Sequence, residues 1–326
     1  MDKKAIRTFL RNYKEHKMAN IMVEKLFFFS DGNRLAADLY LPENYDAKSC
    51  YPAVVVTGSW TTVKEQMAGL YAKRMAENGY LALAFDPSNY GESEGEPRFY
   101  EHPEQKVRDI YNAVTYLLSR HDVNQKAIGA IGVCAGSMYT LIAAAQDERI
   151  HVVGTSASWL HDAEAVKLFY GGEEGVQRRI KEAQAAKKIY QERGEVLYIP
   201  TISKTDPNAA MYGDYDYYLN PARGAVPNWS ADNFAVMSWE DWLTLDPMPS
   251  ASQLNKPTIM VHSDGCVLPQ YTKNFFNKIP TSDKSLYWVE TDLEPPIHQF
   301  YFYDQELEVS IAVEQITHWF NKHLSP

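Results

Sequence analysis

Short apolar runs that alternate with longer amphipathic stretches constrain the fold of this chain more than any other feature. Six runs follow this rhythm: Ala53–Thr57, Leu81–Phe85, Ala127–Val133, Val152–Ser156, Thr258–His262 and Leu286–Val289. Several lack polar alternation, which is typical of strands covered on both faces. Helical patterns lie between or after them, at about 64–78, 103–120, 137–147, 269–279 and 305–323. This alternation predicts an α/β fold with a mostly parallel central sheet flanked by helices. Two further strands are expected within 21–41, around a turn at 30–33.

One long segment breaks the rhythm. Residues 163–250 contain a charged helix at about 172–193 and then a stretch rich in tyrosine and tryptophan. We expect three parts: a first core segment (1–162), a helical lid insertion (163–250) and a second core segment (251–326). Tyr217 and Trp229 in the insertion, together with Trp60, are candidates for substrate contact. The alternative is that these aromatic side chains only pack the insertion onto the core.

Composition excludes several classes of protein. The 326 residues carry a formal net charge of -10 with acids and bases mixed along the chain, which argues against a nucleic-acid partner. No apolar stretch is long enough for a membrane span, and the N-terminal residues do not resemble a signal peptide. Three widely spaced cysteines fit neither a disulfide framework nor a metal site, so we expect a reducing, cytoplasmic setting. The oligomeric state stays open, and a homo-oligomer is compatible with the sequence.

The candidate nucleophile is Cys134. The segment Gly132-Val133-Cys134-Ala135-Gly136 follows a buried strand and opens a helix, which matches a nucleophile elbow with cysteine in the serine position. Glycines two residues either side allow a tight turn, and we expect the helix N-terminus to lower the thiol pKa. The alternative is a buried structural cysteine. Gly91-Glu92-Ser93-Glu94-Gly95 also fits the serine pattern, but a polar loop surrounds it.

A thiol nucleophile needs a base and an acid that orients the base. His298 follows the last expected strand, in a loop before the final helix, and is the candidate base. Asp264 follows the penultimate strand and is the candidate acid, with Asp162 and Asp304 as rivals. The oxyanion hole is expected to combine the N–H of Ala135 with that of Ser59 or Trp60, which follow the first buried strand.

These motifs resemble the α/β-hydrolase superfamily, and within it the dienelactone-hydrolase-like branch with polyketide transferase and thiohydrolase-like proteins. The resemblance rests on residues 57–60 and 64–66, on 86 and 90–98, on 132–136, and on His298 with 302–304. It implies an α/β-hydrolase fold with Cys134, His298 and Asp264 as the triad. It also implies that no cofactor or metal is used. Many relatives carry their acid a residue or so later, where this chain has Gly265 and Cys266.

The sequence therefore predicts a hydrolase that cleaves a small-molecule ester, lactone or thioester through an acyl-cysteine intermediate. One alternative is an acyltransferase or lyase on the same fold. Another is a non-catalytic protein that keeps the fold as a binding or redox-sensing module.

Overall fold

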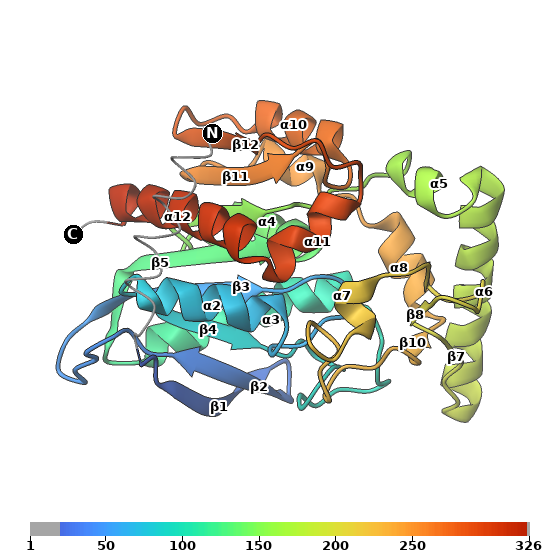
Figure 1. The fold of residues 1–326 in the computed structure, drawn as a ribbon. Coiled ribbons are helices and arrows are strands. Elements are labelled where there is room, and N and C mark those ends of the chain that lie inside the picture. The colour runs from blue at the N-terminus through green and yellow to red at the C-terminus, as the bar shows by residue number, and fades with distance from the viewer. Residues whose placement is uncertain (1–19, 325–326) are drawn as a thin grey trace.

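The computed structural model describes residues 20–324 and has an eight-stranded sheet at its centre (Figure 1). In chain order the strands are β1 (Val23–Ser30), β2 (Asn33–Tyr40), β3 (Tyr51–Thr57), β4 (Leu81–Phe85), β5 (Val123–Val133), β6 (Val152–Ser156), β11 (Thr258–Ser263) and β12 (Lys284–Val289). In space their order is β1-β2-β4-β3-β5-β6-β11-β12. β1 and β2 are antiparallel additions, and every pairing from β4 to β12 is parallel. The predicted fold class is confirmed.

Helices cover both faces of the sheet. Helices α2 (Met67–Glu77) and α12 (Glu306–His323) pack on one face, while α3 (Pro103–Ser119) and α4 (Gly136–Gln146) pack together on the other. Helix α10 (Pro269–Lys278) contacts β11, and the short α11 (Ile297–Asp304) precedes α12. Strands β4 and β6 are buried at every position, which explains why their sequences lack polar alternation.

The inserted segment, residues 163–250, runs between β6 and β11 and lies at one end of the sheet (Figure 1). It contains the helices α5 (Ala165–Phe169), α6 (Gly172–Arg193), α7 (Asp216–Leu219), α8 (Ser238–Thr244) and α9 (Met248–Ala251). Its strands are the short β7 (Tyr198–Ile199), β8 (Ile202–Ser203), β9 (Met211–Tyr212) and β10 (Phe234–Ala235). The long helix α6 has glycines in the left-handed conformation at both ends, Gly171 and Gly194. It packs on α5 and α8.

Two boundaries differ from the sequence prediction. Helix α2 begins at Met67 rather than at Lys64, because residues 64–66 take part in a buried polar network. His298 lies inside helix α11 rather than in a loop. Both differences fall at the candidate site.

Candidate active site

Cys134 occupies a sharp turn between β5 and α4. Its backbone has a positive φ of 56°, a strained conformation for a residue with a side chain. The flanking glycines are required by close packing: a Cβ at Gly132 would lie 2.5 Å from the Ser137 Cα, and one at Gly136 would lie 2.3 Å from the Gly58 carbonyl oxygen. The turn therefore has the geometry of a nucleophile elbow.

The thiol of Cys134 is almost fully buried, at 5% exposure. Around it lie the hydroxyls of Ser59 and Tyr303, the backbone N–H of Ala135 and the side-chain amide of Gln299. Burial is the largest influence and raises the pKa of Cys134, although these four groups oppose the shift. The backbone N–H at the start of the helix does act to lower this pKa, as expected, but desolvation of the thiolate outweighs it and the net shift is upward.

Three residues that line the same cavity as the thiol have backbone N–H groups without an oxygen acceptor among residues 20–324. Within residues 20–324, the amides of Ser59 and Trp60 donate no hydrogen bond, and the Ala135 N–H interacts only with the Cys134 sulfur, although all three residues are buried. Buried backbone donors are rarely left unpaired. These three surround the elbow, so they are available for the oxygen of a bound carbonyl.

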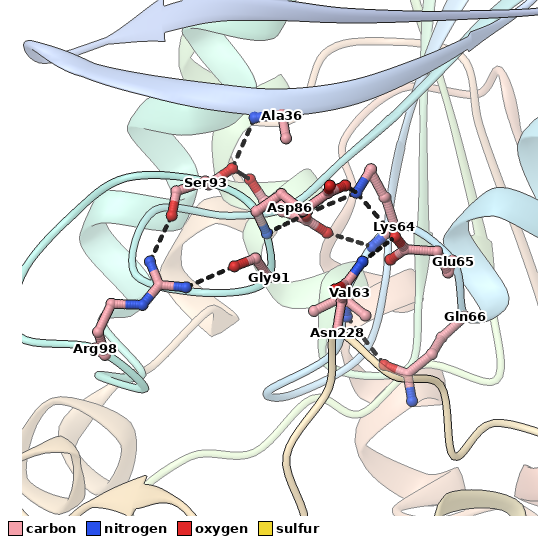
Figure 2. A network of polar contacts seen from close by, with 11 residues as sticks. Ala36, Val63, Lys64, Glu65, Gln66, Asp86, Gly91, Ser93, Arg98 and Asn228 are labelled. Carbon is pink, nitrogen blue, oxygen red and sulfur yellow. Dashed lines mark hydrogen bonds and ion pairs between the residues drawn. The ribbon is translucent and has the colours of Figure 1, made fainter. Parts of the chain in front are cut away.

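A buried polar network fixes the loop that carries Ser59 and Trp60 (Figure 2). The backbone N–H and the ammonium group of Lys64 both donate to the Asp86 carboxylate, at 2.7 and 2.9 Å, and the ammonium group also reaches Glu92 and Glu65. Burial raises the pKa of Asp86, and the charge of Lys64 opposes the shift. At the other end of the loop, the Thr61 N–H donates to the buried Glu101 at 3.0 Å. The loop is therefore held by carboxylates on both sides.

Ser93, in the second pattern that fits a nucleophile motif, belongs to this network (Figure 2). Its hydroxyl accepts from the Ala36 N–H at 2.9 Å and donates to the Asp86 carbonyl at 2.6 Å. These bonds join β2 to the segment after β4. The role of Ser93 is structural.

The polar partners of the His298 side chain are Ser263 and Glu308 rather than Cys134. Its Nδ1 lies 2.7 Å from the Ser263 hydroxyl, and its Nε2 lies 3.5 Å from the Glu308 carboxylate on α12. Within residues 20–324, its polar contacts include neither Cys134 nor Asp264. The structure therefore does not assemble the expected Cys134–His298 pair.

Asp264 is also placed differently from the expectation. Its side chain is 70% exposed, and it pairs with Lys273 at 3.2 Å and accepts from the Trp288 indole at 3.0 Å. The two rivals are also committed elsewhere: Asp162 accepts from backbone N–H groups at the start of α5, and Asp304 forms an ion pair with Arg223 at 2.6 Å. None of the three carboxylates contacts His298, because each stabilises a surface turn or a helix end.

Gln299 is the residue of α11 that faces the thiol. Successive helical residues point about 100° apart, so the side chain after His298 takes the direction that the histidine was expected to have. The Gln299 amide donates to the Ala157 carbonyl at 2.6 Å and accepts from the Val267 N–H at 3.2 Å, which fixes it in place. Sequence reasoning missed Gln299 and Tyr303. The available signal was their spacing of four residues, which puts both on one helix face.

A cavity of about 330 Å³ opens above Cys134. Its walls are mainly aromatic and include Trp60, Trp159, Tyr170, Tyr218, Trp242 and Tyr303. Trp60 is therefore placed as expected, at the cavity wall. Tyr217 and Trp229 do not line it: they pack behind Tyr303 and Tyr218, with ring centroids 5.0 and 5.5 Å apart.

Residues 20–324 contain neither a metal-binding cluster nor a membrane-spanning helix. No cluster of histidine, cysteine or carboxylate side chains in this range has the arrangement of a metal site. No helix in the same part of the chain is both long and apolar enough to cross a membrane.

Comparison with known families decides the class of this protein. Residues 31–253 match the family described as X-Pro dipeptidyl-peptidase (S15 family). The chain belongs to this family. It is an enzyme of the α/β-hydrolase class. The thiol at its elbow is thus part of a hydrolase scaffold and not of an unrelated α/β protein.

This S15-family chain is similar to several named proteins and solved structures. It is 29% identical to the uncharacterised protein YcjY of Escherichia coli K12, over 93% of this chain and all of the relative. It is 36% identical to a thiohydrolase of Aspergillus aculeatus, over 39% of this chain and 38% of that protein. The solved structure of the α/β-hydrolase GrgF from Penicillium superposes with a TM-score of 0.77 at 21% identity, covering 94% of this chain and all of the other. This last similarity shows the fold.

Proposed function

We propose that this enzyme moves the acyl group of a small-molecule ester or thioester through a covalent acyl–Cys134 intermediate. The observation that carries the proposal is the strained, buried thiol at the floor of a cavity, with three backbone N–H groups that lack an oxygen acceptor within residues 20–324. Such an arrangement stabilises the negative charge that develops on a carbonyl oxygen under attack, and one donor of this kind is worth about 3 kcal/mol. His298 and Asp264 are left out of the proposal because neither contacts Cys134.

The acylation step needs no metal or redox partner. The sulfur of Cys134 forms a bond to the carbonyl carbon, and the carbonyl oxygen becomes an oxyanion held by the N–H groups of Ala135 and the Ser59–Trp60 loop. The bond from that carbon to the leaving oxygen or sulfur then breaks. The leaving group takes the thiol proton, which the adjacent Ser59 or Tyr303 hydroxyl can carry.

Thioesters suit this site better than amides. A thiol that exchanges with a thioester replaces one C–S bond with another, and the leaving thiolate is as good a leaving group as Cys134 itself. An amine leaving group would need a strong proton donor. The relative named as a thiohydrolase supports this choice.

Acyl transfer is a second candidate, favoured by one observation. Among residues 20–324, no histidine lines the cavity. Hydrolysis of the acyl-enzyme requires a base to activate water, whereas an amine or thiol acceptor is already a good nucleophile. The site therefore supports acylation better than hydrolysis.

We also propose that the inserted segment acts as a lid and that the protein is cytoplasmic. Tyr170, Tyr212 and Tyr218 of the insertion line the cavity, so the insertion covers the thiol. A thiol nucleophile requires a reducing compartment, and all three cysteines are free.

The experiment is intact-protein mass spectrometry after brief exposure to 4-nitrophenyl acetate or an acyl thioester. We expect one acyl group per molecule on the wild type and on Cys50→Ser, which removes the exposed thiol. Cys134→Ala should show none. Labelling that persists unchanged in Cys134→Ala would contradict the proposal. Addition of cysteamine should discharge the acyl group faster than water does if transfer is the favoured outcome.

A further inference from the structure

In the part of the chain that the structure describes, Arg179 is the one charged side chain that lines the cavity. It comes from helix α6 of the inserted segment, whereas the thiol comes from the core. The pKa of Tyr170 is affected by charges on both Cys134 and Arg179, in opposite directions. Both groups therefore lie near the same aromatic ring, and a single small molecule can reach both.

The guanidinium of Arg179 is held in a fixed orientation. Its Nη1 donates to the carbonyl oxygens of Tyr170 and Gly175, at 2.9 and 3.3 Å. Its central carbon lies 5.5 Å from the centre of the Tyr170 ring and 5.3 Å from that of Trp239. Little side-chain entropy remains to be lost when a ligand binds.

The charge of Arg179 has no carboxylate partner. Within residues 20–324 it forms no ion pair, and its Nε and Nη2 have no hydrogen-bond acceptor. The acid nearest along α6, Glu182, pairs with Arg178 instead, at 3.8 Å. Burial lowers the pKa of Arg179, and the neighbouring Arg178 adds to this effect. A guanidinium nevertheless stays protonated in proteins, so a partly buried positive charge with two free donors faces an apolar cavity.

We propose that this cavity selects acyl donors that carry a carboxylate at the end remote from the reacting carbonyl, with Nε and Nη2 of Arg179 as the bidentate anchor. This inference rests on the proposed function. The chemical class is a half-ester or half-thioester of a dicarboxylic acid, with a short apolar or aromatic link between the aromatic walls. The paired N–H groups match the two oxygens of a carboxylate. One cation among apolar walls balances one negative charge and not the two of a phosphate monoester.

The test compares two esters that differ only in charge: 4-nitrophenyl hydrogen pimelate and its methyl ester. The rate of acylation of Cys134 is followed by release of nitrophenolate. We expect the wild type to prefer the acid by at least about tenfold, since a hydrogen bond to a charged group contributes roughly 1.5–3 kcal/mol. Arg179→Gln should remove the preference, Arg179→Lys should restore part of it, and Lys188→Gln, at an exposed position of the same helix, should leave it unchanged. Thermal unfolding of each variant verifies that it is folded.

A binding measurement separates this inference from the proposed function. Cys134→Ala is titrated with 3-phenylpropionate, with its amide and with phenyl phosphate, and the fluorescence of the cavity tryptophans is recorded. Carboxylate binding that is lost in Cys134→Ala/Arg179→Gln supports the anchor even if no ester acylates the wild type. Equal acylation of both pimelates, unchanged in Arg179→Gln, overturns the anchor and leaves the proposed function intact. Tighter binding of phenyl phosphate than of 3-phenylpropionate overturns the assignment of the carboxylate class.

Discussion

At the scale of single residues, we expect the protonation state of Cys134 to control the rate of the proposed acylation. Burial raises the pKa of this thiol, so the thiolate is scarcer at neutral pH than in a free peptide. The thiolate that does form is in turn a stronger nucleophile, because nucleophilicity rises with the pKa of the thiol. We therefore expect the site to favour activated acyl donors, because their leaving groups need little protonation.

The first prediction concerns pH. The rate of Cys134 alkylation by iodoacetamide should rise with pH and should still be rising above about 8.5, where a free cysteine is half ionised. Peptide mass spectrometry gives the rate at this position separately from the other two cysteines. The same peptide in urea is the reference. A rate that levels off below pH 7 in the folded protein would show that the donors outweigh burial.

The second prediction concerns the side chain that faces the thiol. Gln299→His should place an imidazole beside Cys134 and should accelerate discharge of the acyl-enzyme to water about tenfold or more, because a positioned general base typically contributes more than that. The measurement is steady-state ester hydrolysis between pH 5 and 9, and the gain should appear above the histidine pKa. His298→Gln is the matched control and should change the rate less than twofold. If His298→Gln lowers the hydrolysis rate by a larger factor than Gln299→His raises it, His298 takes part in the mechanism and the account is contradicted.

At the residue scale, one part of the site could be predicted from the sequence and another could not. The elbow could be predicted because glycine spacing reflects steric limits within five consecutive residues, and Gly132, Cys134 and Gly136 are placed as expected. The residue of α11 that faces the thiol could not be predicted, because the choice between His298 and Gln299 depends on how α11 is rotated against β11. That rotation is set by distant partners, Ser263 and Glu308.

At the scale of elements, the loop between β3 and α2 connects the buried network to the site. Lys64 is 1% exposed and Asp86 is fully buried, so their charges depend on one another. Removing one member of a buried ion pair leaves the other charge uncompensated, which typically costs about 4 kcal/mol. The sequence indicated a helix from residue 64 because its apolar spacing continues there, but satisfaction of the Lys64 charge overrides helix propensity.

The third prediction follows from this network. Lys64→Met should lower the free energy of unfolding by about 4 kcal/mol, and urea denaturation measures the change. It should also slow acylation of Cys134, since the Ser59–Trp60 amides lose their support. Lys188→Met is the control, because the Lys188–Glu192 pair is solvent-exposed and such pairs contribute about 1 kcal/mol or less. Equal stability of the two variants would mean that the network does not hold the loop.

At the scale of the whole molecule, the cavity is a joint product of the core and the inserted segment. The core supplies Cys134 and the amides, and the insertion supplies Arg179 and several aromatic walls. The parallel sheet could be predicted from local patterns, since each strand is a short apolar run. The positions of the side chains inside the insertion could not be predicted, because nothing in the sequence distinguishes aromatic residues at the cavity from those that pack behind it. Only tertiary packing separates Tyr218 at the wall from Tyr217 behind it.

The fourth prediction concerns substrate size. A cavity of about 330 Å³ is at the small end of ligand pockets. The specificity constant kcat/KM for acyl thioesters should therefore rise from acetyl to a medium-length or phenylalkyl group and should fall for palmitoyl. The measurement uses one thiol leaving group throughout. A constant that continues to rise up to palmitoyl would show that the insertion opens far wider than in this structure.

The most direct measurement of the central claim is rapid-mixing kinetics with 4-nitrophenyl acetate. We predict a burst of close to one nitrophenolate per active site, followed by slow steady turnover, because Cys134 is acylated at a site without an imidazole. The burst should vanish in Cys134→Ala and persist in His298→Gln. A linear time course without a burst, or a burst that survives Cys134→Ala, would contradict the account.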